Sequence, residues 1–142
     1  MANYYATART NYFEVKDPDK FKAFVAKMPD LVLIEKTVCD AKRKRTLYGF
    51  YVENPDGGGF PTVWATRKGQ WQDVALCNAT ARHLKDGEIA IFVEAGHEKS
   101  RYVTGYAIAI NSKGKSVELC IDNIYNMLDK LAPKGAVTRA EY

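Results

Sequence analysis

The sequence predicts an α+β domain: a mainly antiparallel sheet of about six or seven strands with three helices packed on it. Segments rich in β-branched and aromatic residues follow one another across short turns, as in antiparallel sheets. Three other segments show apolar residues at helical spacing. With 142 residues, 46 % hydrophobic and 27 % charged, the chain has the size and composition of one globular domain. We expect a single domain over residues 1–135 and a loose C-terminal tail over residues 136–142.

The N-terminal part predicts a strand followed by a helix. Residues 4–15 are rich in strand-forming types, and we expect an interruption near residues 9–11. Asp17 then fits the N-cap of a helix, with Pro18 at the first helical position, where its missing N–H costs nothing. Pro29 and Asp30 end this helix. Its buried stripe is expected to consist of Phe21, Phe24, Val25 and Met28.

The next part predicts two strands and a connector. Residues 31–39 and 46–53 are expected strands joined by a basic connection, and residues 47–52 are apolar on both faces, as in a central strand. Residues 54–59 contain Pro and three Gly, which favours a turn or flexible connector and lacks the pattern of a phosphate-binding loop. A short strand is expected over residues 60–66.

From Gln70 the apolar spacing predicts a helix of about four turns, closed by Gly87. Two strands over residues 88–95 and 101–110 then flank a turn, and a short strand follows over residues 116–120. A last helix is predicted from Ile121, Ile124, Tyr125, Leu128 and Leu131, of which Ile124, Leu128 and Leu131 are expected to pack against the sheet.

The formal net charge of +4 is concentrated in one segment. Residues 36–45 hold five cations and one anion, Asp40, so the rest of the chain is electrically balanced. Such a cluster indicates a surface that contacts an anionic partner, either a phosphate backbone or an acidic protein face. The competing interpretation is a solvated hairpin tip whose cations only confer solubility. The predicted partner-binding residues are Lys36, Lys42, Arg43, Lys44, Arg45, Tyr48 and Tyr51.

Aromatic residues next to the cations keep a nucleic-acid-binding function open. Tyr48, Phe50 and Tyr51 follow the basic run directly. Aromatic side chains on a sheet can stack on bases while neighbouring cations contact phosphates. Residues 49–52 echo part of an RNA-recognition strand but lack its full pattern, and a strand of a buried sheet would have the same composition.

No pattern of catalysis, metal binding or cofactor binding is present in the sequence. Cys39, Cys77 and Cys120 are widely separated and odd in number, so we expect reduced, partly buried thiols and no zinc site. His83 and His97 are expected on an exposed helix surface and in a hairpin tip. No catalytic residue, metal ligand or cofactor is therefore predicted, and a small Cys/His enzyme remains a third alternative.

Two blocks carry a resemblance. Residues 3–17, NYYATARTNYFEVKD, and residues 94–106, EAGHEKSRYVTGY, together resemble small accessory proteins that phages, plasmids and integrative elements of bacteria encode. Some proteins of that group act against host defences, as anti-CRISPR or antirestriction proteins. The resemblance implies a stoichiometric inhibitor that occludes a nucleic-acid-binding or effector surface, and it transfers no catalytic residue.

The function predicted from the sequence is a non-enzymatic binding protein of a phage or mobile element. It would inhibit a host nucleic-acid-targeting defence complex, such as a CRISPR effector, by steric occlusion. A DNA- or RNA-binding accessory protein of the same element is the alternative. The sequence shows neither a signal-peptide pattern nor an apolar run long enough to span a membrane, so the expected location is the bacterial host cytosol. The oligomeric state is not predicted.

Overall fold

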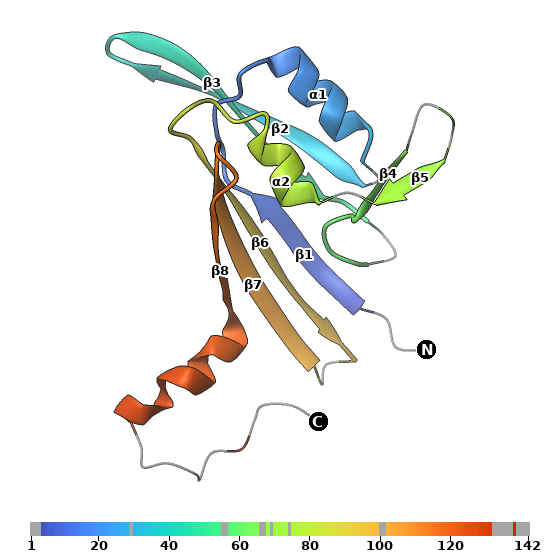
Figure 1. The fold of residues 1–142 in the computed structure, drawn as a ribbon, viewed down its shortest axis with the longest axis vertical. Helices are drawn as coiled ribbons and strands as arrows, with labels where there is room; N and C mark the ends of the chain where they lie inside the picture. The colour runs from blue at the N-terminus through green and yellow to red at the C-terminus, as the bar shows by residue number, and fades with distance from the viewer. Residues whose placement is uncertain are drawn as a thin grey trace.

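The architecture is a six-stranded antiparallel sheet in the order β2-β3-β1-β6-β7-β8, with a separate two-stranded sheet, β4-β5 (Figure 1). This confirms the predicted α+β class. The computed structural model describes residues 4–28, 30–54, 57–65, 68, 70–73, 75–99, 102–131 and 138. The elements are β1 (Tyr4–Thr10), α1 (Pro18–Ala26), β2 (Leu31–Asp40), β3 (Arg43–Val52), β4 (Val63–Ala65), β5 (Trp71–Asp73), α2 (Leu76–Ala81), β6 (Ile89–Glu98), β7 (Tyr102–Asn111), β8 (Ser116–Cys120) and the 3₁₀ helix η1 (Ile121–Lys130).

The first strand of the chain lies in the middle of the sheet. β1 pairs with β6 over its whole length, from Tyr4 opposite Glu98 to Thr10 opposite Phe92, and it pairs with β3 on its other side. Beyond Thr10 the regular pairing ends, which matches the predicted interruption. β1 therefore joins the β2–β3 hairpin to the meander formed by β6, β7 and β8.

Helix α1 begins and packs as the sequence predicts. The Asp17 carboxylate accepts hydrogen bonds from the backbone N–H groups of Asp19 and Lys20, at 3.1 and 3.2 Å, which caps the helix. The predicted stripe of the helix is buried against the sheet. The main core contains Phe13, Val15, Phe21, Phe24, Val25, Met28, Tyr48, Phe50, Leu76, Ala81, Leu84, Ala90, Phe92 and Ile110.

The helix predicted to start at Gln70 is much shorter in the structure. Residues 71–73 form β5 and pair with β4, with Trp71 opposite Ala65, and α2 spans only Leu76–Ala81. Pairing with the neighbouring strand β4 overrides a helical spacing that so few residues define only weakly. Gly87 does have a positive φ of 86°, but it lies in a turn closed by the Glu88 N–H on the Lys85 carbonyl, not at the end of the helix.

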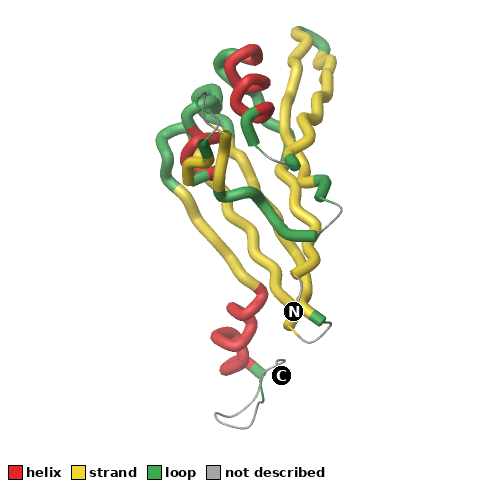
Figure 2. The backbone as a smooth tube through the Cα atoms, turned by 90° about the vertical axis from the view of Figure 1, so that its right-hand side faces the viewer, coloured by secondary structure: helices red, strands yellow, loops and turns green. Residues whose placement is uncertain are grey.

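The last helix lies at one end of the sheet and is largely uncovered. η1 follows β8 directly, and Figure 2 shows it beyond the ends of the strands. Ile121 contacts the sheet at Gly105, where an added Cβ would lie 3.0 Å from the Ile121 side chain. Leu131 is 83 % exposed, Ile124 is also exposed and Leu128 is half-buried. The expectation that this helix buries Ile124 and Leu131 against the sheet is therefore wrong.

The glycine-rich connector is held against the sheet where the structure describes it. The Gly58 N–H donates to the Tyr4 carbonyl at 3.0 Å, and Gly57 and Gly58 have φ values of 90° and 99° that favour glycine. The predicted tail over residues 136–142 lies outside the described residues except for Thr138. No helix among the described residues is long and apolar enough to cross a membrane.

The sheet has two faces of different character. Along β6, Ala90, Phe92 and Glu94 point toward α1 and α2 and are buried, whereas the alternate residues point away from the helices and are exposed. We call these the inner face and the outer face. The cross-strand register carries the same alternation to the neighbouring strands.

Candidate partner-binding surface

The predicted basic cluster lies at the tip of the β2–β3 hairpin. The two strands pair from Leu31 opposite Val52 to Asp40 opposite Arg43, so residues 41 and 42 form the turn. The hairpin extends past α1 at one corner of the molecule (Figure 1). The four cations of residues 42–45 were expected in a loop between strands. Arg43, Lys44 and Arg45 instead lie on β3, and only Lys42 lies in the turn. The paired strands of the hairpin therefore present them.

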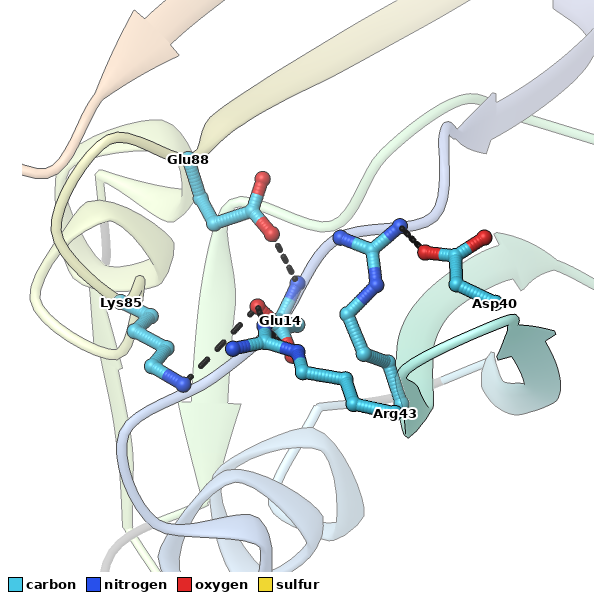
Figure 3. A network of polar contacts seen from close by, with 6 residues as sticks. Glu14, Asp40, Arg43, Lys85 and Glu88 are labelled. Carbon is cyan, nitrogen blue, oxygen red and sulfur yellow. Dashed lines mark hydrogen bonds and ion pairs between the residues drawn. The ribbon is translucent and has the colours of Figure 1, made fainter.

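Two cations of the cluster form ion pairs. Arg43 donates to both carboxylate oxygens of Glu14 at 3.3 Å, and Lys85 lies 3.9 Å from the same carboxylate (Figure 3). Arg45 lies 3.5 Å from Asp40 across the hairpin. Within the described part of the chain, Lys42 and Lys44 form no ion pair, and both are exposed. Of the cations in residues 42–45, these two lysines are the ones that no described ion pair neutralises.

The rest of the predicted binding residues divide between the surface and the core. Lys36 lies on the outer face, with its ammonium 5.6 Å from the ring centre of Tyr12, and Arg9 lies 5.9 Å from the same ring. Tyr51 is exposed on this face opposite Arg9. Arg9, Tyr12, Lys36 and Tyr51 thus form a mixed cationic and aromatic surface on the outer side of β1, β2 and β3.

Tyr48 does not belong to that surface. It is only 5 % exposed and packs in the core with its ring centre 6.2 Å from that of Phe21. Tyr48 and Phe50 are two residues apart on β3, so their side chains lie on the same face of the sheet, and Phe50 is fully buried. The prediction that Tyr48 contacts a partner is therefore corrected: it is a core residue.

A second exposed surface was not anticipated from the sequence. On the outer face, β6, β7 and β8 carry exposed apolar side chains, including Val117 and Leu119, which are 70 % and 61 % exposed. The signal was present, because β6 reads Ile-Ala-Ile-Phe-Val and is apolar on both faces. A strand with one face in water normally alternates with polar residues.

An apolar groove of about 390 Å³ lies on this side of the sheet, between β7 and η1. Its floor includes Gly105 and Ala107, and Ile121, Ile124 and Met127 of η1 line one wall. These three residues repeat every third position, which places them on one side of a 3₁₀ helix. The exposed side of η1 and the outer face of the sheet therefore form one continuous apolar surface.

The inner face holds a buried carboxylate, that of Glu94. Glu94 is 9 % exposed. It accepts hydrogen bonds from the Tyr4 hydroxyl at 3.0 Å, the Tyr106 hydroxyl at 3.2 Å and the Phe60 N–H at 2.7 Å. Gly59 packs so closely on this carboxylate that a Cβ would collide with it.

The two tyrosines act as fixed donors to Glu94. Burial, and then the charge of Glu94, raises the pKa of Tyr106 well above its ordinary value, and burial likewise raises the pKa of Tyr4. Both hydroxyls therefore stay protonated at neutral pH. The cluster fastens the connector at Phe60 to β6 and β7, and its carboxylate is fully occupied by structural hydrogen bonds.

The cysteines and histidines lie apart and in different surroundings. Cys39 and Cys120 are exposed, contrary to the expectation of partly buried thiols, whereas burial raises the pKa of the half-buried Cys77 thiol. His83 is half-buried rather than exposed: its ring stacks on Phe24 at 4.8 Å, and burial lowers its pKa. His97 lies on β6, not in the hairpin tip. Among the described residues no group of three or more His, Cys, Asp or Glu is arranged to hold a metal ion.

Comparison with protein-family models, with curated proteins and with solved structures finds no match for this chain. The candidate surfaces are therefore judged by their own residues, namely the basic hairpin tip, the cationic and aromatic surface beside it, and the apolar outer face.

Proposed function

We propose that this chain is a non-enzymatic binding protein that acts by occupying a partner through the tip of the β2–β3 hairpin. The observation that carries the proposal is the presentation of Lys42 and Lys44. Both are exposed on a projecting hairpin, and neither is neutralised by an ion pair within the described residues. Cations held in this way attract an anionic partner and raise the association rate.

The partner class that we propose is a nucleic-acid-targeting defence complex in the cytosol of a bacterial host, with the chain acting as its stoichiometric inhibitor. This part of the proposal rests on the resemblance of residues 3–17 and 94–106 to accessory proteins of mobile elements. The two blocks are neighbours in the sheet, since Tyr4 pairs with Glu98 and Ala8 with Glu94. They form a scaffold next to the basic hairpin, and the hairpin supplies the contact.

The test is a pair of matched double variants, Lys42→Glu/Lys44→Glu and Lys113→Glu/Lys115→Glu. Each changes two exposed lysines of a hairpin without removing a described ion pair, and each lowers the formal net charge by four, from +4 to 0. Tagged protein is used to capture partners from a bacterial lysate, and each capture is analysed by mass spectrometry. We expect the Lys42/Lys44 variant to lose the partner and the Lys113/Lys115 variant to retain it.

Equal retention by both variants would show that the hairpin cations serve only solubility. Replacing Lys42, Arg43, Lys44 and Arg45 together by Glu is less informative, because a Glu at position 43 would face Glu14. A loss of binding could then come from a loss of stability. Once a target is captured, occupancy is checked by titration. Inhibition by a binding protein levels off at a fixed ratio to the target, whereas an enzyme would inactivate an excess of target with time.

Nucleic-acid binding is the second candidate, favoured by the cations around Tyr12. Lys36 and Arg9 flank this ring on the outer face, and Tyr51 is exposed beside them. A gel shift with single-stranded DNA and RNA over a salt series separates the two candidates. Phosphate contacts would make the affinity fall steeply with salt, and Lys36→Glu would then weaken binding more than Lys113→Glu.

A further inference from the structure

The outer face of β6, β7 and β8 carries no formal charge. None of its twelve positions is Asp, Glu, Lys or Arg, although 27 % of the whole chain is charged. The absence of charge at the centre of a surface distinguishes interfaces from ordinary exposed faces. We call this surface the apolar face. Its residues are Ile89, Ile91, Val93, Ala95, His97, Val103, Gly105, Ala107, Ala109, Asn111, Val117 and Leu119.

The apolar face has relief. On its central strand, β7, Ala107 lies between Val93 and Leu119, and Ala109 lies between Ile91 and Val117, whereas Gly105 lies beside Ala95 and is covered by Ile121. Val93 and Leu119 flank Ala107, and the groove of about 390 Å³ lies over this part of β7. The surface is therefore a valley along β7 with a ridge along β6 on one side and a ridge along β8 on the other.

The apolar face is large enough for a stable interface. Strands about 4.8 Å apart, with a rise of about 3.3 Å for each residue, give the 25 residues of β6, β7 and β8 an area on the order of 400 Å². The exposed side of η1 adds on the order of 200 Å², from about 2 Å of rise over each of its ten residues. The two together give about 600 Å² on each partner, above the roughly 500 Å² a side that a biological interface should bury and below the roughly 800 Å² of a standard one.

We propose that the apolar face packs against the apolar face of a second copy of this chain, forming a twofold-symmetric dimer. A surface made of one valley and adjacent ridges is complementary to itself. A twofold axis parallel to the strands, between β6 and β7, places the β6 ridge of each copy over the β7 valley of the other, and the β8 ridge over the outer side of the partner's β1. The two sheets then lie about 10 Å apart, the usual distance between packed sheets.

This arrangement also covers the exposed side of η1. Ile124 and Met127 line the groove at the end of the apolar face, so they would contact the strand of the partner that packs over β7. The basic hairpin tip is on the other side of β1, on the β2–β3 hairpin, and stays free in the dimer. The inference goes beyond the proposed function, because a dimer would present two hairpins whether or not they bind a defence complex.

The test is the oligomeric state of the full chain in solution, measured under reducing conditions because Cys39 and Cys120 are exposed. Sedimentation equilibrium between about 1 and 100 µM covers the range in which mass action reveals a weak dimer. We expect the average mass to rise with concentration toward twice the chain mass of 16.0 kDa. The disrupting variant is Leu119→Lys, and its matched control is Glu118→Lys, the neighbouring exposed residue on the opposite face of β8.

We expect Leu119→Lys to sediment as a monomer and Glu118→Lys to remain a dimer. Leu119 is 61 % exposed, so the substitution should not disturb the core, and circular dichroism checks the fold. Ala107→Lys, in the valley itself, serves as a second disrupting variant if the first one aggregates. A wild-type monomer throughout the concentration range, or a dimer that both disrupting variants retain, would overturn the proposal. The Lys42→Glu/Lys44→Glu variant should remain dimeric, which separates this result from the test of the hairpin.

Discussion

At the residue scale, the buried Glu94 shows why polar residues inside the domain need their partners. Its carboxylate accepts from two tyrosine hydroxyls and one backbone N–H, and these bonds hold the connector at Phe60 on the sheet. A hydrogen bond to a charged group contributes about 1.5–3 kcal/mol, and donors left buried without an acceptor incur a further desolvation cost. Glu94 is therefore a structural residue of the inner face.

We predict that Glu94→Ala lowers the free energy of unfolding by about 3 kcal/mol. The reason is that Tyr4, Tyr106 and Phe60 lose their common acceptor together. Urea denaturation measures the change. Glu98→Ala is the control, since Glu98 lies on the same strand and the same face but is less buried, and its loss should stay within about 0.5 kcal/mol. Equal losses for the two variants would contradict the structural role of Glu94.

The two-residue period of a strand is enough to assign some side chains to the buried face of the sheet. Glu94 follows Phe92 at the strand period and is buried with it, and Tyr48 precedes Phe50 in the same way. Both could have been assigned to the core from that spacing. The partners of Glu94 could not, because Tyr4 reaches it only through the pairing of β1 with β6, and Phe60 only because the connector lies against the sheet.

At the element scale, α1 and η1 differ in whether the sheet covers their apolar side. α1 has a side-chain cap and a stripe of apolar residues that the sheet covers completely. η1 has an equally clear apolar spacing, but its side chains remain exposed in the single chain. Spacing alone predicts that a helix has an apolar side, and it does not show whether that side meets its own sheet or another surface.

We predict opposite outcomes for truncations in these two helices. Phe21→Ala should destabilise the fold by about 3–5 kcal/mol, because Phe21 is fully buried among Phe13, Phe24 and Phe50. Leu131→Ala should change the free energy of unfolding by less than about 0.5 kcal/mol, because Leu131 is 83 % exposed. Thermal or urea unfolding compares them. A loss at Leu131 similar to that at Phe21 would mean that η1 is part of the core.

At the scale of the whole molecule, local patterns predicted the elements, and non-local pairing decided their arrangement. Strand β8 and the cap of α1 follow from the residues of those segments alone. The position of β1 between β3 and β6 does not, since nothing in residues 4–10 specifies two distant neighbours. Strand β5 was missed for a different reason, because the apolar spacing from Gln70 onward favoured a helix over a short strand paired with β4. The basic hairpin could be located from its charge, but which cations are paired depends on Glu14 and Asp40.

The chain as a whole buries one face of its sheet and leaves half of the other face apolar and exposed. The main core lies entirely on the inner side, around α1 and α2. The fold of one copy therefore does not depend on the apolar face, whereas the stability of the proposed dimer does. The melting temperature of the chain should therefore depend on whether the dimer has formed.

We predict that the melting temperature of the wild-type chain rises with protein concentration, because association stabilises the folded state by mass action. Leu119→Lys should remove that dependence, since the introduced ammonium group would have to lose its water where β8 packs on β1 of the partner, in the cross-strand row that also holds Arg9. At the lowest concentration, where the wild-type chain is mostly dissociated, the two melting temperatures should coincide, because Leu119 contributes little to the core of a single copy. Thermal unfolding followed by circular dichroism over a hundredfold concentration range, about 1–100 µM, measures both effects. A variant that melts lower than the wild type by the same margin at every concentration would assign Leu119 to the fold of the single chain.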